Sequence, residues 1–219
     1  MQGLFISFEG GEGSGKSTQI ARLKRWLEKT YPDQEFVMTR EPGGTAQAEE
    51  IRAILVNGSA DKITPQTEAL LMIAARTENV DKVIKPALAR NAVVVSDRFV
   101  DSSRVYQAMA VGNDISSIDQ IHEFGFGNLQ PDLTFVMDVE PDIGLQRAYQ
   151  RIADKGEGGS GDEDRFETKG PEFHQRVRAG FLALAEQFPA RIKVIDASRS
   201  PDDVTSQITS HIASFLDSR

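Results

Sequence analysis

A glycine-rich segment at residues 10–17 (GGEGSGKS) limits what this 219-residue chain can fold into. It follows a short apolar run at residues 4–8, which is typical of a buried strand in a parallel sheet. After it, Ile20, Leu23 and Leu27 lie on one face of an amphipathic helix. The glycines therefore join a strand to a helix, which is the first unit of an alternating α/β chain.

The same alternation continues to the end of the chain. Apolar runs predict four further strands, at residues 36–38, 92–95, 133–139 and 192–195. Helical patterns and N-terminal caps predict helices over residues 46–56, after Thr64, near Pro141 and after Ser200. Strands that alternate with helices indicate an α/β fold with a parallel sheet, and we expect a single domain over residues 1–219.

The composition argues against several other classes of protein. The formal net charge is -8, whereas a non-specific nucleic-acid binder neutralises phosphates with basic surface. The chain has no cysteine, so it can form neither disulfides nor thiolate metal sites. Its N-terminus lacks the features of a signal peptide, and no stretch approaches the roughly 18 apolar residues of a membrane span. We expect a soluble, cytoplasmic protein.

The glycine-rich segment matches the pattern G-x-x-x-x-G-K-[ST] of a phosphate-binding loop, or P-loop. In such a loop the polyphosphate lies against backbone N–H groups, so side chains must be absent and unusual φ values must be allowed. Lys16 would reach the β- and γ-phosphates of ATP, and the Ser17 hydroxyl would bind Mg²⁺. The residues expected around ATP are Gly10, Gly11, Glu12, Gly13, Ser14, Gly15, Lys16, Ser17 and Thr18.

Other patterns narrow the class of P-loop protein. The guanine-reading pattern NKxD and the pattern DxxG of GTP-binding switches do not occur in the sequence. The strand at residues 92–95 leads into Asp97 and Arg98, at the strand end where parallel sheets bind their ligands. Asp97 is thus a second candidate ligand of Mg²⁺. The alternative for Asp97 and Arg98 is an ordinary ion pair at the end of a strand.

Several segments together resemble the thymidylate kinase family. In chain order they are FEG at 8–10, TREPGGT at 39–45, AAR at 74–76, DRF at 97–99, SS at 102–103, YQ at 106–107, PDLT at 131–134 and DRFE at 164–167. The resemblance implies an α/β P-loop nucleoside monophosphate kinase fold, with a five-stranded parallel sheet flanked by helices and a lid. It also implies transfer of the γ-phosphoryl group of ATP to dTMP with Mg²⁺, and a homodimer.

The resemblance further implies roles for individual residues. Arg98 would act in catalysis by contacting the dTMP phosphate and the transferring group. Arg52 would be a second phosphate contact, and Arg76 would read the thymine edge. An arginine suits O4 of thymine because it only donates, whereas the amino group of cytosine would leave its donors unpaired. Glu12 would approach the dTMP 3′-hydroxyl, and Glu41 would support the pocket. The residues expected near the base and sugar are Ser103, Tyr106 and Gln107. The alternatives are a solvated helix position for Arg52 and core packing for Tyr106.

Two departures from the family pattern concern the base and the lid. Met72 stands where the family commonly has a phenylalanine that stacks on thymine. Gly13 stands where some members carry an arginine, and the resemblance implies that lid arginines supply that charge instead. We expect the lid at about residues 151–168, with Arg151 and Arg165 as catalytic arginines. Its run of glycines (GEGGSG) also fits a flexible surface loop.

Two other functions are also compatible with the sequence. One is another nucleoside monophosphate kinase on the same scaffold, and the other is a nucleotide-binding regulator without turnover. Lys16 and the Asp97-Arg98 pair favour turnover, because binding alone needs less machinery. The three histidines form no spaced cluster, and we expect them to be surface or packing residues: His122, His174 and His211.

Overall fold

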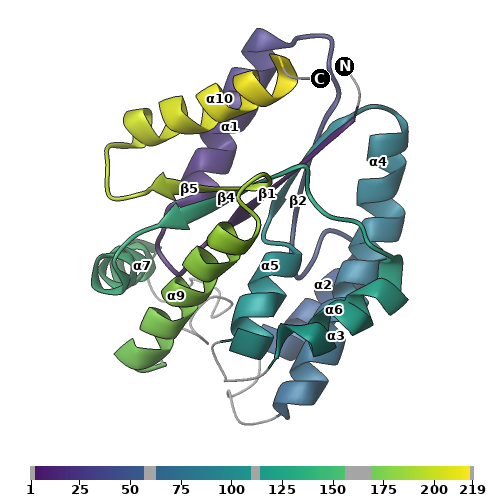
Figure 1. Ribbon diagram of the computed structural model, residues 1–219, viewed down its shortest axis with the longest axis vertical. Coiled ribbons are helices and arrows are strands. Elements are labelled where there is room, and N and C mark those ends of the chain that lie inside the picture. Colours follow the sequence, from purple (N-terminus) through teal and green to yellow (C-terminus); the bar gives the residue numbers. More distant parts are fainter. Residues whose placement is uncertain (1–2, 57–62, 110–113, 156–168, 218–219) are drawn as a thin grey trace.

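The computed structural model describes residues 3–56, 63–109, 114–155 and 169–217. At its centre lies a five-stranded sheet in the order β2-β3-β1-β4-β5 (Figure 1). The strands are β1 Leu4–Glu9, β2 Phe36–Arg40, β3 Val93–Asp97, β4 Leu133–Asp138 and β5 Ile192–Asp196. Every pair of neighbouring strands is parallel, so the five predicted strands and the parallel sheet are confirmed.

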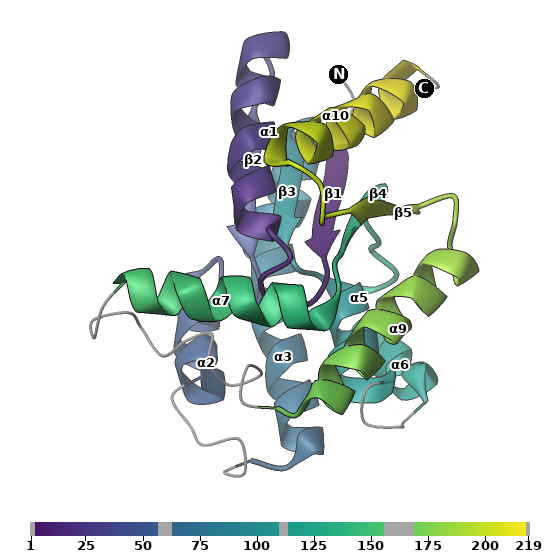
Figure 2. The ribbon, with the colours of Figure 1, turned by 90° about the vertical axis from the view of Figure 1, so that its left-hand side faces the viewer.

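Helices cover both faces of the sheet. α1 (Lys16–Thr30) and α10 (Pro201–Asp217) pack together on one face (Figure 1, Figure 2). The other helices are α2 Ala46–Val56, α3 Pro65–Asn79, α4 Lys85–Ala89, α5 Val100–Ser103, α6 Ile115–Phe126, α7 Pro141–Lys155 and α9 Pro171–Gln187, with π-helical turns η1 Val80–Ile84 and η2 Arg104–Ala108. The predicted cap at the start of α3 is present, since the Thr64 side chain accepts from the Thr67 N–H at 3.2 Å. Among the helices of the described ranges, none is long and apolar enough to cross a membrane.

Alternate side chains of the strands enter two separate apolar layers, because successive residues of a strand point to opposite faces. Leu4, Ile6 and Phe8 of β1 pack in a core that includes Leu23 of α1. Phe5 instead packs with residues of η1 and α4 on the opposite side of the sheet. All six residues of β1 are buried, which explains why the strand reads as a continuous apolar run rather than an alternating one.

The carboxyl ends of the strands meet at one edge of the sheet. β1 lies in the middle, with β3 and β4 as its neighbours, and the P-loop follows β1 directly. β2 and β3 end beside each other, with Arg40 paired in register with Asp97. Ligands of open parallel sheets bind outside this edge, so the fold brings the P-loop and the predicted Asp97-Arg98 pair to one place.

Candidate active site

A crevice of about 430 Å³ opens at the carboxyl edge of the sheet. The predicted residues that line it are Glu12, Gly13, Ser14, Gly15, Lys16, Ser17, Thr18, Glu41, Arg52, Met72, Asp97, Arg98, Tyr106, Gln107 and Arg151. Gly10 and Gly11 line a separate, smaller cavity, and Arg76 and Ser103 are outside the lining of both. Arg165 and most of the predicted lid at 151–168 lie outside the described residues.

The P-loop folds around the ammonium group of Lys16. Gly10 and Gly15 have φ values of 132° and 89°, which residues with a side chain rarely adopt. Lys16 Nζ donates to the carbonyl oxygens of Gly10 and Gly11 at 3.1 and 3.0 Å. Burial, together with the charge of Arg98, lowers the pKa of Lys16 to about 8. The lysine is therefore held in the loop, next to the helix N-terminus where phosphates bind.

Gly13 leaves no room for a side chain. Its φ is 63°, and a Cβ atom there would overlap the carbonyl oxygen of Gly144, in the first turns of α7. A Cβ atom on Gly144 would in turn overlap the carbonyl oxygen of Glu12. The P-loop and α7 thus pack backbone against backbone, and this contact excludes an arginine at residue 13.

Ser17 and Asp97 present oxygen atoms side by side in the crevice. Ser17 Oγ, in the first turn of α1, donates to Asp97 Oδ2, at the end of β3, over 3.2 Å. Mg²⁺ takes hard oxygen ligands and usually needs only one or two protein ligands beside the substrate phosphates. The pair therefore fits Mg²⁺. Within the described ranges, no group of three or more His, Cys, Asp or Glu residues could hold a metal on its own.

Arg98 has an unusual backbone conformation and directs its guanidinium toward the P-loop. Its φ is 69°, in the left-handed region that residues other than glycine rarely adopt. Nη1 donates to the carbonyl oxygen of Gly10 and to Ser102 Oγ, both at 3.1 Å. Nη2 donates to Glu12 Oε1 at 2.9 Å, and Cζ lies 5.1 Å from the centre of the Tyr106 ring. The guanidinium of Arg98 is therefore held in the crevice by these contacts, and it stays positively charged.

Glu12 is the carboxylate that faces this arginine. It accepts from the Tyr106 hydroxyl at 3.1 Å as well as from Arg98. Burial disfavours its charge, but the positive charges of Arg98 and Lys16 outweigh burial and lower the pKa of Glu12. The Tyr106 ring is buried against Phe181, so Tyr106 packs in the core and presents its hydroxyl to the crevice at the same time.

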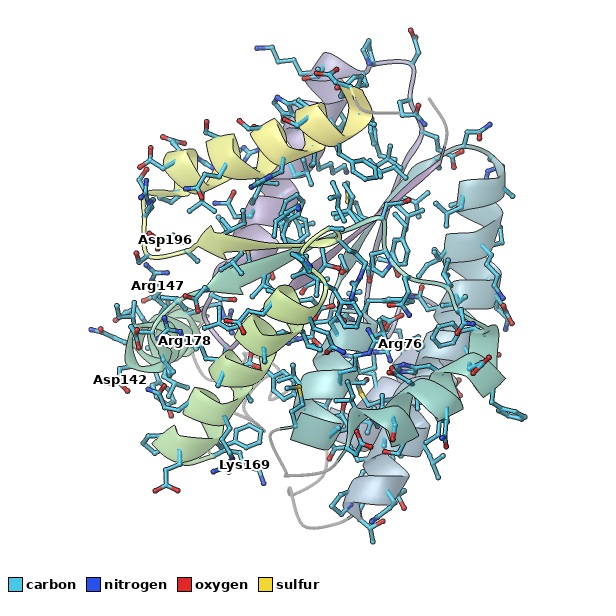
Figure 3. All side chains as sticks on the ribbon, in the orientation of Figure 1. Arg76, Asp142, Arg147, Lys169, Arg178 and Asp196 are labelled. Atoms are coloured by element: carbon cyan, nitrogen blue, oxygen red, sulfur yellow. The ribbon has the colours of Figure 1, made fainter. Side chains whose placement is uncertain are left out.

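Arg76 is fully buried and lies outside the lining of the crevice. Figure 3 labels it among the helices beside the sheet. Its Nε forms an ion pair with Glu41. Its Nη1 donates to Ser103 Oγ at 3.0 Å and lies 2.6 Å from His122 Nε2. Its Nη2 donates to the carbonyl oxygen of Phe99 at 3.0 Å. The structure therefore joins Arg76, Glu41 and Ser103 in one network, but it does not bring Arg76 to the crevice surface.

His122 belongs to this network, which the sequence did not reveal. Arginine has no acceptor, so Nε2 of His122 must accept and Nδ1 must carry the proton. Burial, followed by the charge of Arg76, lowers the pKa of His122 to about 2, so the ring is neutral. The available signal was weak: His122 follows Ile118 by four residues on the buried face of α6, a position that also suits simple packing.

The remaining predicted residues contribute from α2, α7 and η2. Arg52 Nη1 donates to the carbonyl oxygen of Pro42 at 3.0 Å, and Gln107 Nε2 donates to a carboxylate of α3 at 2.9 Å. Arg151 lines the crevice from the last turns of α7. Arg147, one turn earlier, instead donates to the carbonyl oxygen of Ala197 at 2.9 Å and does not line the crevice.

The chain is similar to known proteins along almost its whole length. The sequence model described as Thymidylate kinase matches residues 8–208. The chain is 48% identical over 215 residues to a thymidylate kinase of Caulobacter vibrioides, covering 98% of both chains. It is 44% identical over 214 residues to one of Ruegeria pomeroyi, covering 98% of this chain and 96% of that one.

A solved structure agrees with these sequence matches. The crystal structure of thymidylate kinase from Ehrlichia chaffeensis superimposes with a TM-score of 0.76 and 33% sequence identity. The match covers 97% of this chain and 99% of that one, so the expected nucleoside monophosphate kinase fold is confirmed. The family model and the relatives cover the P-loop, the crevice and the helices around it, and the chain belongs to the thymidylate kinase family.

Proposed function

We propose that this crevice is the place where the γ-phosphoryl group of ATP passes to dTMP to give dTDP, with ATP on the P-loop and dTMP beside Arg98. The activity itself, ATP-dependent phosphorylation of dTMP, follows from membership of the family. One observation carries the assignment to the crevice: Lys16, Arg98 and the Ser17–Asp97 pair converge on it. Phosphoryl transfer depends mostly on positioning and on neutralising charge, which such a set of groups can do.

On the donor side, the proposed roles belong to the P-loop and the end of β3. Lys16 would exchange its contacts with the loop carbonyls for the β- and γ-phosphate oxygens. Ser17 and Asp97 would hold Mg²⁺, which when bound neutralises charge on those oxygens. The backbone N–H groups from Gly13 to Thr18 would surround the phosphates at the start of α1.

On the acceptor side, Arg98 would bind the dTMP phosphate with its planar fork of donors. Arg52, which lines the same crevice from α2, would be the second phosphate contact. Glu12 would accept from the 3′-hydroxyl of dTMP. The Tyr106 ring, held by core packing and by its hydrogen bond to Glu12, would crowd a 2′-hydroxyl and favour the deoxyribose.

The thymine base would lie near Met72, Gln107 and the Arg76 network. Met72 and Gln107 line the crevice, and Arg76 follows Met72 by one turn of α3. The Met72 thioether would cover the ring face where the family commonly uses phenylalanine. Glu41 and Ser103 each bond to Arg76 and hold it in the network, and to read O4 the buried guanidinium would exchange one of its internal contacts for the base.

The charge that neutralises the transferring group would come from Arg151 and Arg165. The backbone contact between Gly13 and Gly144 supports this proposal, because it leaves no space for an arginine in the P-loop itself. Arg151 already lines the crevice. Closure of the lid over the nucleotides would exclude water and bring these arginines to the phosphates.

The protein would act as a homodimer. It would work in the cytoplasm, where its nucleotide substrates are. α3 and α6 pack together, and each carries a large apolar side chain that is well exposed: Leu70 at 56% and Phe124 at 93%. Single apolar side chains are often exposed, but these two lie on helices that pack together, and a contact between two copies of the chain would bury both.

A coupled assay of ADP release tests the proposed function. Purified protein would be given ATP and Mg²⁺ with dTMP, dUMP, dCMP, AMP or GMP in turn. We expect clear turnover with dTMP and much slower turnover with the others. A preference for another monophosphate would indicate a different kinase on this scaffold, and tight ATP binding without turnover would favour a regulator.

A further inference from the structure

We propose that Glu9 is a positioning residue that holds Arg98 in the conformation needed to bind the acceptor phosphate. Glu9 is the last residue of β1 and has no part in the roles described above. The inference rests on the proposed role of Arg98 and extends it to a carboxylate in the core. It follows from three features: the burial of Glu9, its two partners, and the backbone conformation of Arg98.

Glu9 is a carboxylate with no exposed surface, and both of its oxygens are used. Oε1 accepts from the backbone N–H of Phe99 at 2.8 Å, and Oε2 accepts from Ser102 Oγ at 2.5 Å. A carboxyl group in such a place is unfavourable unless its hydrogen bonds are made. Both partners lie next to Arg98 in space or in sequence, so Glu9 is aimed at the segment that carries the arginine.

The first bond acts on the backbone of Arg98. Arg98 follows β3 directly, and its φ of 69° lies in the left-handed region. Its own N–H donates to the carbonyl oxygen of Phe8, and its carbonyl oxygen accepts from Ser96 Oγ at 2.7 Å. The N–H of Phe99 is then directed into the core, where Glu9 accepts from it. Without that acceptor a buried donor would be unsatisfied, and the left-handed conformation would lose the bond that favours it.

The second bond acts on the guanidinium. Ser102 Oγ donates its hydrogen to Glu9, so a lone pair of the same oxygen is directed to Arg98 Nη1 at 3.1 Å. A hydroxyl that is held by a hydrogen bond to a buried group is a better-oriented acceptor than a freely rotating one. Glu9 therefore constrains Arg98 at both ends, through Phe99 at its backbone and through Ser102 at its head group.

The best conservative variant is Glu9→Gln. Burial, followed by the charge of Asp101, raises the pKa of Glu9 to about 8. A neutral amide offers one acceptor for the Phe99 N–H, and its NH2 group donates to Ser102 Oγ, which reverses the direction of that bond but keeps the hydroxyl oxygen in place. Glu9→Leu has a similar volume but neither group. The pair of variants separates the hydrogen bonds of Glu9 from its bulk.

The experiment compares the dissociation constants of dTMP and thymidine for the wild type, Glu9→Leu and Glu9→Gln. The two ligands differ only in the phosphate, so their ratio reports on the phosphate contacts, and of these Glu9 would act on Arg98. We expect Glu9→Leu to weaken dTMP about tenfold, as the loss of one charge-assisted hydrogen bond would, and to leave thymidine binding nearly unchanged. Glu9→Gln should restore most of the dTMP affinity.

A second arm repeats Glu9→Leu in an Arg98→Ala background. The loss of dTMP affinity caused by Glu9→Leu should disappear there, because the residue through which Glu9 acts is gone. An equal loss for dTMP and thymidine, or an undiminished loss without Arg98, would overturn the proposal. If Glu9→Leu does not fold, Ser102→Ala removes the link to the guanidinium instead and should also weaken dTMP selectively. Arg98→Ala that leaves the dTMP-to-thymidine ratio unchanged would refute the role of Arg98 itself, which is a separate failure.

Discussion

Gly13 and Gly144 meet backbone to backbone, so that a Cβ atom on Gly13 would overlap the carbonyl oxygen of Gly144. The contact joins the phosphate-binding loop to the helix that runs toward the predicted lid. It exists only because both residues lack a side chain. A glycine inside a helix is otherwise unfavourable by about 1 kcal/mol relative to alanine, so the close approach gives this position a physical reason.

Gly144→Ala should therefore impair the P-loop although helix propensity alone would favour it. The gain of about 1 kcal/mol in propensity competes with an overpacking cost of about 1 to 3 kcal/mol against the carbonyl oxygen of Glu12. We expect a higher KM for ATP and a lower kcat, measured by the coupled assay. Gly170→Ala is the control, because Gly170 is the N-cap residue before α9 and has open space around it, so this variant should keep wild-type kinetics. Unchanged kinetics in Gly144→Ala would mean that α7 can shift away from the P-loop without affecting it.

Arg76→Ala should weaken dTMP binding far more than ATP binding. The substitution also leaves Glu41 buried without its cation, which costs on the order of 3 to 5 kcal/mol of folding stability. Urea denaturation measures that loss, and the two KM values measure the effect on the substrates. Arg76→Lys keeps a positive charge near Glu41 but cannot reach four partners, so it should fold better and still bind dTMP poorly. Equal increases in both KM values would contradict the role in base recognition.

The buried ring of His122 should make the protein less stable in acid. Its folded pKa is lowered to about 2, whereas the unfolded chain protonates it near pH 6.5. The folded state thus binds fewer protons between these values, and stability falls as the pH is lowered below about 6.5. By pH 5 this loss reaches about 2 kcal/mol.

His122→Gln removes this titration while the amide oxygen can still accept from Arg76. We expect the free energy of unfolding of the variant to fall less steeply than that of the wild type between pH 7 and pH 5. His211→Gln is the comparison variant: burial also lowers the pKa of His211, but that ring is far less buried, so its replacement should change the pH dependence less. Identical pH dependence of wild type and His122→Gln would show that the pKa of His122 is the same in the folded and unfolded protein.

The sequence predicted the sheet well because its strands are local apolar runs. It did not predict α6 or α9, whose buried residues recur at helical spacing but stand among charged and polar neighbours. The sequence pattern of the π-helical turns η1 and η2 does not distinguish them from α-helix. Their wider turns alter the direction of side chains such as Tyr106, which tertiary packing decides.

The site residues likewise fall into those that the sequence could predict and those that it could not. The P-loop and the Asp97-Arg98 pair could be predicted because each motif is contiguous in sequence. The four partners of Arg76 lie between 23 and 46 residues away from it in the sequence. No local sequence pattern could therefore predict that they contact it. The roles of Glu9 and His122 arise only where the fold brings these segments together.

Phe124→Glu should shift the oligomeric state toward the monomer. A glutamate placed at a side chain that is 93% exposed in one chain would not disturb the fold, but it would introduce charge into the proposed apolar contact between two copies. Sedimentation of wild type and variant at equal concentration measures the effect. Tyr149→Glu, on α7 and 53% exposed, is the control and should remain a dimer. A Phe124→Glu protein that sediments as the wild type does would exclude α6 from the contact.

Arg151→Ala should lower kcat of phosphoryl transfer with little change in the KM for dTMP. Arg151 lines the crevice, and a cation that arrives with the lid would act on the charge of the transferring group rather than on the bound acceptor. The effect should be on the order of tenfold or more in kcat, since arginines of this kind contribute strongly to phosphoryl transfer. Arg147→Ala provides a matched control one turn earlier on α7, because its guanidinium is bonded to the carbonyl oxygen of Ala197 and is not part of the crevice lining. If both variants lost kcat equally, the loss would reflect damage to α7. If neither did, the charge would have to come from Arg165 or elsewhere, and the assignment of Arg151 would be wrong.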